Sequence, residues 1–255
     1  MTSPLKYWLE AEGRLVRLRL NKPKANLINA EMIAALEAAF AKHLRSNEIA
    51  AVLLDAEGPH FSFGASVEEH LPDRCETMLR SLHRVILHMV ESPVPILVAV
   101  RGHCLGGGLE VAMAAHLMFV APDAHLAQPE MKLGVFAPAA SCLLPELVGP
   151  GRAIDLLLSG RGITGSEAVT MGLARESSLE PERAALAYFQ EHIKPKSASS
   201  LRLAVRAARL DFCARVRSNI ERVERIYLDE LMATHDAVEG LNAFLEKRAA
   251  QWQQR

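Results

Sequence analysis

Three consecutive glycines precede a glutamate in residues 105–110, which read Leu-Gly-Gly-Gly-Leu-Glu. Consecutive glycines let backbone N–H groups approach a ligand closely, and a helix that begins here presents its partly positive N-terminus to negative charge. A plain tight turn from strand to helix is the alternative interpretation. The phosphate-loop pattern GxxxxGK[ST] is absent, and the spacing of the glycines from Gly102 to Gly108 does not match GxGxxG. The segment therefore favours a ligand-binding turn of another kind.

Two carboxylates accompany this turn. Glu110 lies in the first turn of the predicted helix, where it either interacts only with the helix dipole or sits beside the ligand of the glycine N–H groups. Glu130 follows Gln128-Pro129 in a mostly apolar stretch. A lone loop glutamate is usually solvated surface, whereas an apolar site would raise its pKa. Two carboxylates in unlike environments supply an acid and a base at one pH, although the sequence alone does not bring these two together.

Composition excludes several other classes of protein. The 255 residues are 50% hydrophobic and 23% charged, which is typical of a globular protein and not of a disordered or fibrous one. The formal net charge is −1, so no overall field attracts nucleic acid or an anionic membrane. The apolar run at residues 93–100 is far shorter than the roughly 20 residues that span a bilayer. We therefore expect neither nucleic acid nor a membrane as a partner.

The cysteines and histidines indicate neither a disulfide framework nor a metal site. The four cysteines are far apart and form no CxxC motif, which favours a reducing cytoplasm. The ten histidines form no HExxH motif and no Cys/His cluster at zinc spacing, so we predict no metal. The first ten residues lack a basic region followed by an apolar core, so we expect no signal peptide.

The elements that must position these segments alternate between short strands and helices. Alternating residues predict a half-exposed strand at residues 14–20, and apolar runs predict strands at residues 49–54, 96–100 and 117–121. Helical periodicity predicts a helix from Ala30, another over residues 75–90 and a short one from Gly107; the apolar face of the first is Ile33, Leu36, Phe40 and Leu44. This order predicts an α/β fold, with pairs of short strands between the helices.

The C-terminal part has no strand pattern. Its periodicity predicts helices at residues 199–217, 220–232 and 236–255. We therefore divide the chain into an α/β core at residues 1–196 and a helical region at residues 197–255. Such a tail either packs on a partner subunit or completes its own core.

The order and spacing of three motifs along the chain are informative. The motifs are Gly64-Ala65-Ser66-Val67, Leu105-Gly106-Gly107-Gly108-Leu109-Glu110 and Gln128-Pro129-Glu130-Met131-Lys132-Leu133-Gly134. With matching segments at residues 23–26 and 236–248, they resemble the enoyl-CoA hydratase (crotonase) family over nearly the whole chain. Each motif alone is moderately specific, and the ordered set is strongly specific. The resemblance implies a crotonase-like spiral of ββα repeats with a C-terminal helical trimerisation region, assembled as a homotrimer or as a hexamer of two trimers.

The resemblance also implies an acyl-CoA thioester as substrate, with no cofactor because coenzyme A is part of the substrate. The N–H groups of Ala65 and Gly107 would form the oxyanion hole. Glu110 and Glu130 would be the catalytic pair, which favours hydration over the family's hydrolase, isomerase and decarboxylase branches. The CoA-binding positions implied are Lys24, Ala25, Leu27, Ser66, Val67, Phe244 and Lys247, the last two reaching CoA on a neighbouring subunit. Ordinary surface charge is the alternative for both lysines.

Two departures from the family pattern bear on the substrate. Ser66 replaces the usual Asp, and residues 136–142, Phe-Ala-Pro-Ala-Ala-Ser-Cys, replace the usual Pro-Gly-Ala-Gly-Gly. Residues 64–72 and 133–141, together with residues 235–240, most resemble a subgroup that hydrates cyclohexa-1,5-diene-1-carbonyl-CoA to 6-hydroxycyclohex-1-ene-1-carbonyl-CoA in anaerobic benzoyl-CoA degradation. A general short-chain enoyl-CoA hydratase is the alternative within the family, and a non-catalytic protein that binds acyl-CoA or RNA is the alternative of another class.

Overall fold

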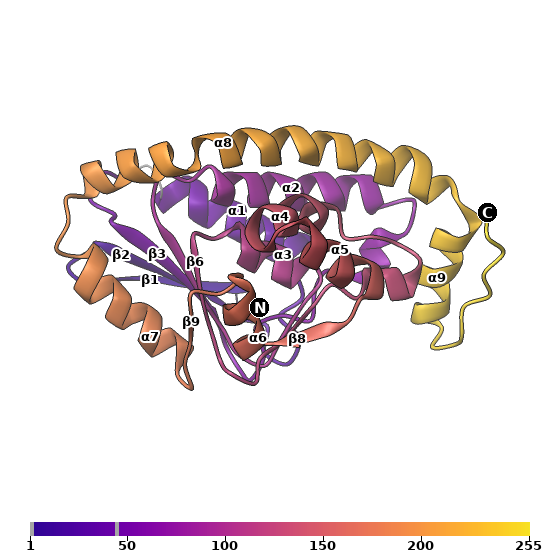
Figure 1. The fold of residues 1–255 in the computed structure, drawn as a ribbon, viewed down its shortest axis with the longest axis horizontal. Helices are drawn as coiled ribbons and strands as arrows, with labels where there is room; N and C mark the ends of the chain where they lie inside the picture. The colour runs from indigo at the N-terminus through magenta and orange to yellow at the C-terminus, as the bar shows by residue number, and fades with distance from the viewer. Residues whose placement is uncertain (1–2, 44–45) are drawn as a thin grey trace.

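The computed structural model describes residues 3–43 and 46–255, and it contains two sheets (Figure 1). The larger sheet has the order β1 (Leu5–Glu10), β2 (Leu15–Leu20), β3 (Ala51–Ala56), β4 (Ile96–Val100), β6 (Leu117–Val120) and β9 (Glu176–Ser177). Only its first pair is antiparallel. The smaller sheet has the order β5 (His103–Leu105), β7 (His125–Ala127) and β8 (Gly162–Thr164). The predicted strands at residues 49–54, 96–100 and 117–121 are confirmed within one or two residues.

Helices pack on both sheets and on one another. They are α1 (Ala30–His43), α2 (Cys75–Val90), α3 (Gly107–Ala114), α4 (Pro138–Val148), α5 (Pro150–Ser159), α6 (Gly165–Met171), α7 (Pro181–Tyr188), α8 (Ala198–Arg225) and α9 (His235–Leu245). The predicted helices at residues 75–90 and from Gly107 are confirmed, and so is the helix from Ala30, whose predicted apolar residue Leu44 lies outside the described residues. Within the described ranges, no helix is both long and apolar enough to cross a membrane.

Successive residues of a strand point to opposite faces of the larger sheet, and different helices cover the two faces. In β3, Leu54 packs with α1 and α2, while Leu53 packs beneath α7 and the π-helical turn that follows it, Phe189–Ile193. Both faces of a largely parallel sheet are therefore covered, which is why its strands are almost continuously apolar.

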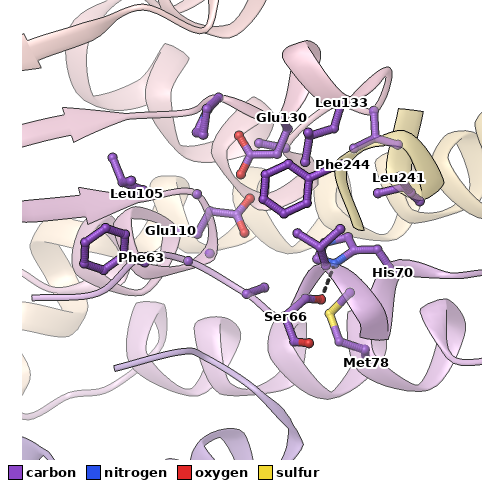
Figure 2. A pocket seen from close by; sticks show the side chains of 18 of the residues that line it. Phe63, Ser66, His70, Met78, Leu105, Glu110, Glu130, Leu133, Leu241 and Phe244 are labelled. Atoms are coloured by element: carbon purple, nitrogen blue, oxygen red, sulfur yellow. Dashed lines mark hydrogen bonds between the residues drawn. The ribbon is translucent and has the colours of Figure 1, made fainter. Parts of the chain in front are cut away.

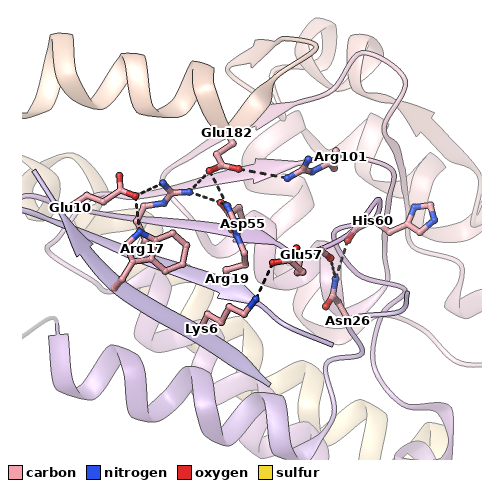
Figure 3. A network of polar contacts seen from close by, with 11 residues as sticks. Lys6, Glu10, Arg17, Arg19, Asn26, Asp55, Glu57, His60, Arg101 and Glu182 are labelled. Atoms are coloured by element: carbon pink, nitrogen blue, oxygen red, sulfur yellow. Dashed lines mark hydrogen bonds and ion pairs between the residues drawn. The ribbon is translucent and has the colours of Figure 1, made fainter. Parts of the chain in front are cut away.

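Burial of Arg17 overturns the prediction that residues 14–20 form a half-exposed strand. Arg17 is only 2% exposed, because it points to the α7 side of the sheet. There it contacts Asp55 at 2.7 Å, Glu10 at 2.9 Å and Glu182 of α7 (Figure 3). Arg19 also contacts Asp55, at 2.6 Å. The alternation in the sequence is real, but its polar residues face a buried ionic network instead of solvent.

The C-terminal region is helical, with boundaries that differ from those predicted. Residues 199–217 and 220–232 do not form separate helices: α8 runs unbroken to Arg225 and continues as a π-helical turn, Ile226–Glu230. The last helix is shorter than predicted, since α9 ends at Leu245 and residues 249–255 have no regular structure. Figure 1 shows α8 crossing over α2 and α4 toward α9. The division into two domains at residue 196 stays a prediction.

Candidate active site

A cavity of about 760 Å³ lies where the glycine turn, α2, the start of α4 and α9 meet (Figure 2). Its lining is mostly apolar and includes Leu79, Leu82, Val135, Phe136, Pro138 and Leu241. Both candidate carboxylates, Glu110 and Glu130, lie in it, and Figure 2 shows Phe244 beside Glu130. A large apolar cavity with a few convergent polar groups is the usual form of a small-molecule site.

Two backbone segments are held side by side at one wall of the cavity. The Ser62 N–H donates to the His103 carbonyl at 3.0 Å, and the Leu105 N–H donates to the Ser62 carbonyl at 3.0 Å. A methyl group added at Gly107 would lie 3.2 Å from the Ala65 nitrogen, so the two predicted oxyanion-hole residues are neighbours. Among the described turns and caps, neither N–H donates to a backbone carbonyl. Both are therefore available to an oxygen in the cavity.

Gly106 is required at its position for two reasons. Its φ of +48° is in the left-handed region, and a methyl group added there would lie 2.5 Å from Glu130 Oε1. A larger residue would be strained and would displace the carboxylate. The first glycine of the run thus lets the turn and Glu130 approach each other.

Glu110 is almost fully buried, at 3% exposure, on the first turn of α3. Its Oε1 accepts a 2.8 Å hydrogen bond from the N–H of Ala140 in the first turn of α4. Burial raises the pKa of Glu110, and the N–H groups of Ala140 and Ala139 and the His83 ring oppose this increase. The carboxylate therefore has specific partners that favour its ionised form.

Glu130 begins a 3₁₀ turn, Glu130–Leu133, and has a different environment. Burial, followed by the charge of Glu110, raises the pKa of Glu130 to about 8. The side-chain amide of buried Gln128 lies 3.2 and 3.1 Å from the two carboxyl oxygens of Glu130, within hydrogen-bond distance of both. At neutral pH the protonated form of Glu130 is therefore favoured, and the two carboxylates differ as an acid and base should.

The structure brings most of the predicted site residues to this cavity. Ala65, Gly107, Glu110 and Glu130 line it, as do the predicted CoA-binding residues Leu27, Ser66, Val67 and Phe244. Phe244 lines the cavity of its own chain, while its predicted contact with a neighbouring subunit's CoA stays a prediction.

The other predicted CoA-binding residues do not line the cavity. Lys24 and Lys247 are exposed and have positive φ angles of 87° and 55°. The carbonyl of Ala25 accepts a 2.9 Å hydrogen bond from Phe63, a lining residue, so this backbone lies next to the cavity. The roles of Lys24, Ala25 and Lys247 in CoA binding remain predictions.

Sequence reasoning missed four groups around the site: Gln128 as a partner of Glu130, the Ala140 N–H, His70 and His83. His70 lines the cavity and its Nδ1 donates to the Ser66 carbonyl at 2.8 Å, while burial lowers its pKa. A conspicuous signal existed only for Gln128, which stands two residues before Glu130. The others approach the glutamates only through tertiary packing.

Comparison with known proteins identifies the family. A model described as Enoyl-CoA hydratase/isomerase matches residues 10–255. The chain belongs to the enoyl-CoA hydratase/isomerase family. It is 61% identical over 254 residues to the cyclohexa-1,5-dienecarbonyl-CoA hydratase of Thauera aromatica, a match that covers 100% of this chain and 98% of that protein. The predicted family and enzyme class are thereby confirmed.

Solved structures of the enoyl-CoA hydratase/isomerase family share the fold. An enoyl-CoA hydratase/isomerase from Pseudoalteromonas atlantica T6c matches with a TM-score of 0.85 at 27% identity, over 98% of this chain and 99% of that one. An enoyl-CoA hydratase from Bacillus halodurans matches with a TM-score of 0.86 at 20% identity, over 94% of this chain and 100% of that one. The predicted crotonase fold with a helical C-terminal region is confirmed, and the role of that region in trimerisation stays a prediction.

Proposed function

We propose that this enzyme adds water reversibly to cyclohexa-1,5-diene-1-carbonyl-CoA and forms 6-hydroxycyclohex-1-ene-1-carbonyl-CoA, a step of anaerobic aromatic degradation. The observation that carries the proposal is the 61% identity, over the full chain, with a hydratase named for this substrate. The apolar cavity with its two unlike carboxylates supports it. Both glutamates are present, which argues against a non-catalytic binding protein.

The reaction begins with polarisation of the thioester. The N–H groups of Ala65 and Gly107 donate to the carbonyl oxygen and draw electrons from the conjugated diene. Glu110 takes a proton from water as the water oxygen bonds to the ring carbon next to the one that carries the carbonyl group. Negative charge then spreads over the thioester oxygen and the ring, where the two N–H groups stabilise it.

The second half of the reaction delivers a proton to carbon. Glu130 gives its proton to the far end of the former diene, and the remaining double bond shifts to the ring carbon that carries the carbonyl group. The proton that Glu110 took from water replaces the one that Glu130 lost, so the atoms of one water molecule are added overall. The favoured protonation of Glu130 supports this assignment of roles. The reverse assignment is the alternative, since coupled carboxyls titrate as a pair.

The wall formed by Phe136, Ala137 and Pro138 supports a cyclic substrate. Phe136 packs edge to face on buried Tyr227, with ring centroids 5.2 Å apart, and Pro138 is the first residue of α4. A flat ring loses little conformational entropy against such a fixed wall, whereas a flexible acyl chain must fix several torsions. We therefore expect selectivity for the ring.

Measuring kcat/KM for the cyclic dienoyl-CoA and for crotonyl-CoA under one condition tests the proposal. The cyclic substrate should be preferred by at least about tenfold, the scale of one or two unmatched methylene contacts. Phe136→Ala should reduce that preference, because it removes the ring that forms the wall. Equal or better efficiency of the wild type with crotonyl-CoA would instead assign the enzyme to the general enoyl-CoA hydratases.

The proposal includes a homotrimer or a dimer of trimers located in the cytoplasm. In support of the location, the four cysteines Cys75, Cys104, Cys142 and Cys213 are free thiols, as a reducing compartment requires. In support of the assembly, α8 exposes Leu203 and Leu210, at 63% and 71%, two helical turns apart on one face.

A further inference from the structure

A histidine ring forms part of the cavity wall near the predicted oxyanion hole. His70 is the last residue of the 3₁₀ turn Val67–His70, which begins two residues after Ala65. The turn packs against α2 and α9. Two apolar residues of these helices, Met78 and Leu241, line the cavity together with His70 (Figure 2). An apolar side chain would suit this packing, so the polar ring needs a chemical explanation.

The hydrogen bond of the ring determines which nitrogen can act on a ligand. His70 Nδ1 lies 2.8 Å from the Ser66 carbonyl, which can only accept, so Nδ1 carries the hydrogen (Figure 2). In a neutral ring, Nε2 is then an acceptor. Among the described residues Nε2 has no hydrogen-bond partner, yet it is not fully enclosed. Because the ring lines the cavity, this acceptor is available to a ligand there.

The surroundings favour the neutral ring. Burial lowers the pKa of His70, and the hydrogen bond to Ser66 opposes this effect only in part. Within the described ranges no carboxylate forms an ion pair with this ring, and the histidines that have such a partner are His83, His192 and His235. A neutral ring with Nδ1 already occupied can only accept at Nε2, so it suits a ligand group that carries an O–H or N–H.

Hydration gives the acyl group such a hydrogen. Neither the cyclic diene nor its thioester has an O–H or N–H group, whereas addition of water forms a hydroxyl group next to the carbon that carries the carbonyl. The amide N–H groups of the CoA arm are the other candidates. The apolar residues that accompany His70 in the cavity wall, Met78 and Leu241, suit a hydrocarbon ring better than a polar CoA arm. The hydroxyl group is therefore the better partner.

We propose that His70 recognises the hydroxyl group of the hydrated acyl-CoA by accepting its hydrogen bond at Nε2. In the forward reaction the attacking water has two hydrogens, and Glu110 takes one of them as a proton. His70 accepts the hydrogen bond of the other, which stays on the oxygen in the product. In the reverse reaction it orients the hydroxyl group that leaves as water. The inference rests on the proposed function for the position of this hydroxyl group.

The test measures binding of two CoA esters that differ by one hydroxyl group, 6-hydroxycyclohex-1-ene-1-carbonyl-CoA and cyclohex-1-ene-1-carbonyl-CoA. Calorimetric titration of the full-length Glu130→Gln enzyme, in which turnover of the hydroxy ester is slow, gives the ratio of the two affinities. Adding His70→Phe, which keeps a ring without an acceptor, should lower the preference for the hydroxy ester about fivefold, the scale of one hydrogen bond.

The matched control is Met78→Leu in the same background. It changes an apolar residue of the cavity wall, so it should alter both affinities by the same factor. An unchanged ratio in folded His70→Phe would overturn the inference. Equal weakening of both esters would also overturn it, because the ring would then contact the CoA arm. If His70→Phe does not fold, His70→Leu repeats the measurement with a smaller apolar side chain.

A second pair of esters separates this inference from the proposed function. 3-Hydroxybutyryl-CoA and butyryl-CoA differ by a hydroxyl group on the corresponding carbon of a straight chain. If the wild type hydrates crotonyl-CoA and not the cyclic diene, only the proposed function fails, and the straight-chain pair tests His70 in the same way. The preference for 3-hydroxybutyryl-CoA should then fall about fivefold in His70→Phe. An unchanged preference would overturn the inference.

Discussion

The N–H of Ala140 donates a 2.8 Å hydrogen bond to Glu110 Oε1, so the first turn of α4 holds a carboxylate of α3. Pro138 has no N–H, and the next N–H groups of the helix, those of Ala139 and Ala140, are the ones that face Glu110. The unpaired N–H groups of a helix N-terminus favour a negative charge. One segment therefore forms the wall of the cavity and supports the proposed base.

Replacing either glutamate with glutamine tests the catalytic pair. Glu110→Gln and Glu130→Gln should each lower kcat by at least about 100-fold, the low end of a general acid–base contribution. Affinity for the CoA ester should change little, because neither residue is assigned to the nucleotide. Steady-state kinetics and calorimetric titration with a non-reactive CoA ester measure the two effects. A variant with near wild-type turnover would remove that glutamate from the mechanism.

The raised pKa of Glu130 predicts a pH-dependent cost to stability. Between about pH 4.5 and pH 8, the unfolded chain ionises Glu130 while the folded protein keeps it protonated. The unfolded state is then favoured progressively as pH rises through this window. Glu130→Gln cannot ionise, so its gain in Tm over the wild type should be larger at pH 8.5 than at pH 5. A gain that is equal at both values would mean that Glu130 ionises normally in the folded protein.

The C-terminal segment should support Glu130 from outside the cavity. A methyl group added at Gly134, which ends the 3₁₀ turn of Glu130, would lie 3.0 Å from Trp252 Cζ3, so the indole packs directly on this glycine. The Asp236 carboxylate accepts from the N–H groups of Gln253 and Gln254, at 2.7 and 2.8 Å, and fixes the segment.

Trp252→Ala should therefore lower kcat by several-fold, because the turn that carries Glu130 loses its outer contact. Gln251→Ala is the matched control: only its backbone N–H bonds to Glu239, at 2.8 Å, so the substitution leaves that bond intact. Steady-state kinetics of both variants provide the comparison. Equal kcat values for the two would show that the segment does not affect the site.

Light scattering tests the predicted assembly. The intact enzyme at micromolar concentration should have the mass of a trimer or a hexamer, because the exposed apolar residues of α8 need a partner surface. Deletion of the residues after Gly240 should weaken CoA-ester affinity, since it removes Phe244 from the cavity. A monomeric mass of the intact enzyme would contradict the prediction.

The sequence predicted features that depend on local pattern. Apolar runs and helical periodicity gave α2 and β4 with their observed bounds, and the glycine run gave the start of α3. The ordered motifs predicted a shared site for Glu110 and Glu130, which line one cavity. Predicting these features requires only the residues of one short segment or a strongly specific set of motifs.

Features that depend on distant partners could not be predicted in this way. Arg17 alternates with apolar residues as a solvent-facing side chain would, and only its contact with Glu182 of α7 reveals its burial. His83 fits an ordinary amphipathic helix, and Glu224 on α8 gives it a specific partner. The break predicted near residue 218 is absent because α8 packs along α2 and α4, which stabilises one continuous helix.

The cover that α7 and its π-helical turn provide has a consequence for synthesis of the chain. The ribosome releases Leu53, Leu97 and Phe119 long before Ala185, Phe189 and Ile193, the residues that bury them. Until then, one face of the nascent sheet is apolar and the charges of Arg17 and Asp55 lack Glu182. A nascent chain that pauses before residue 181 therefore exposes an apolar face of the kind that chaperones bind.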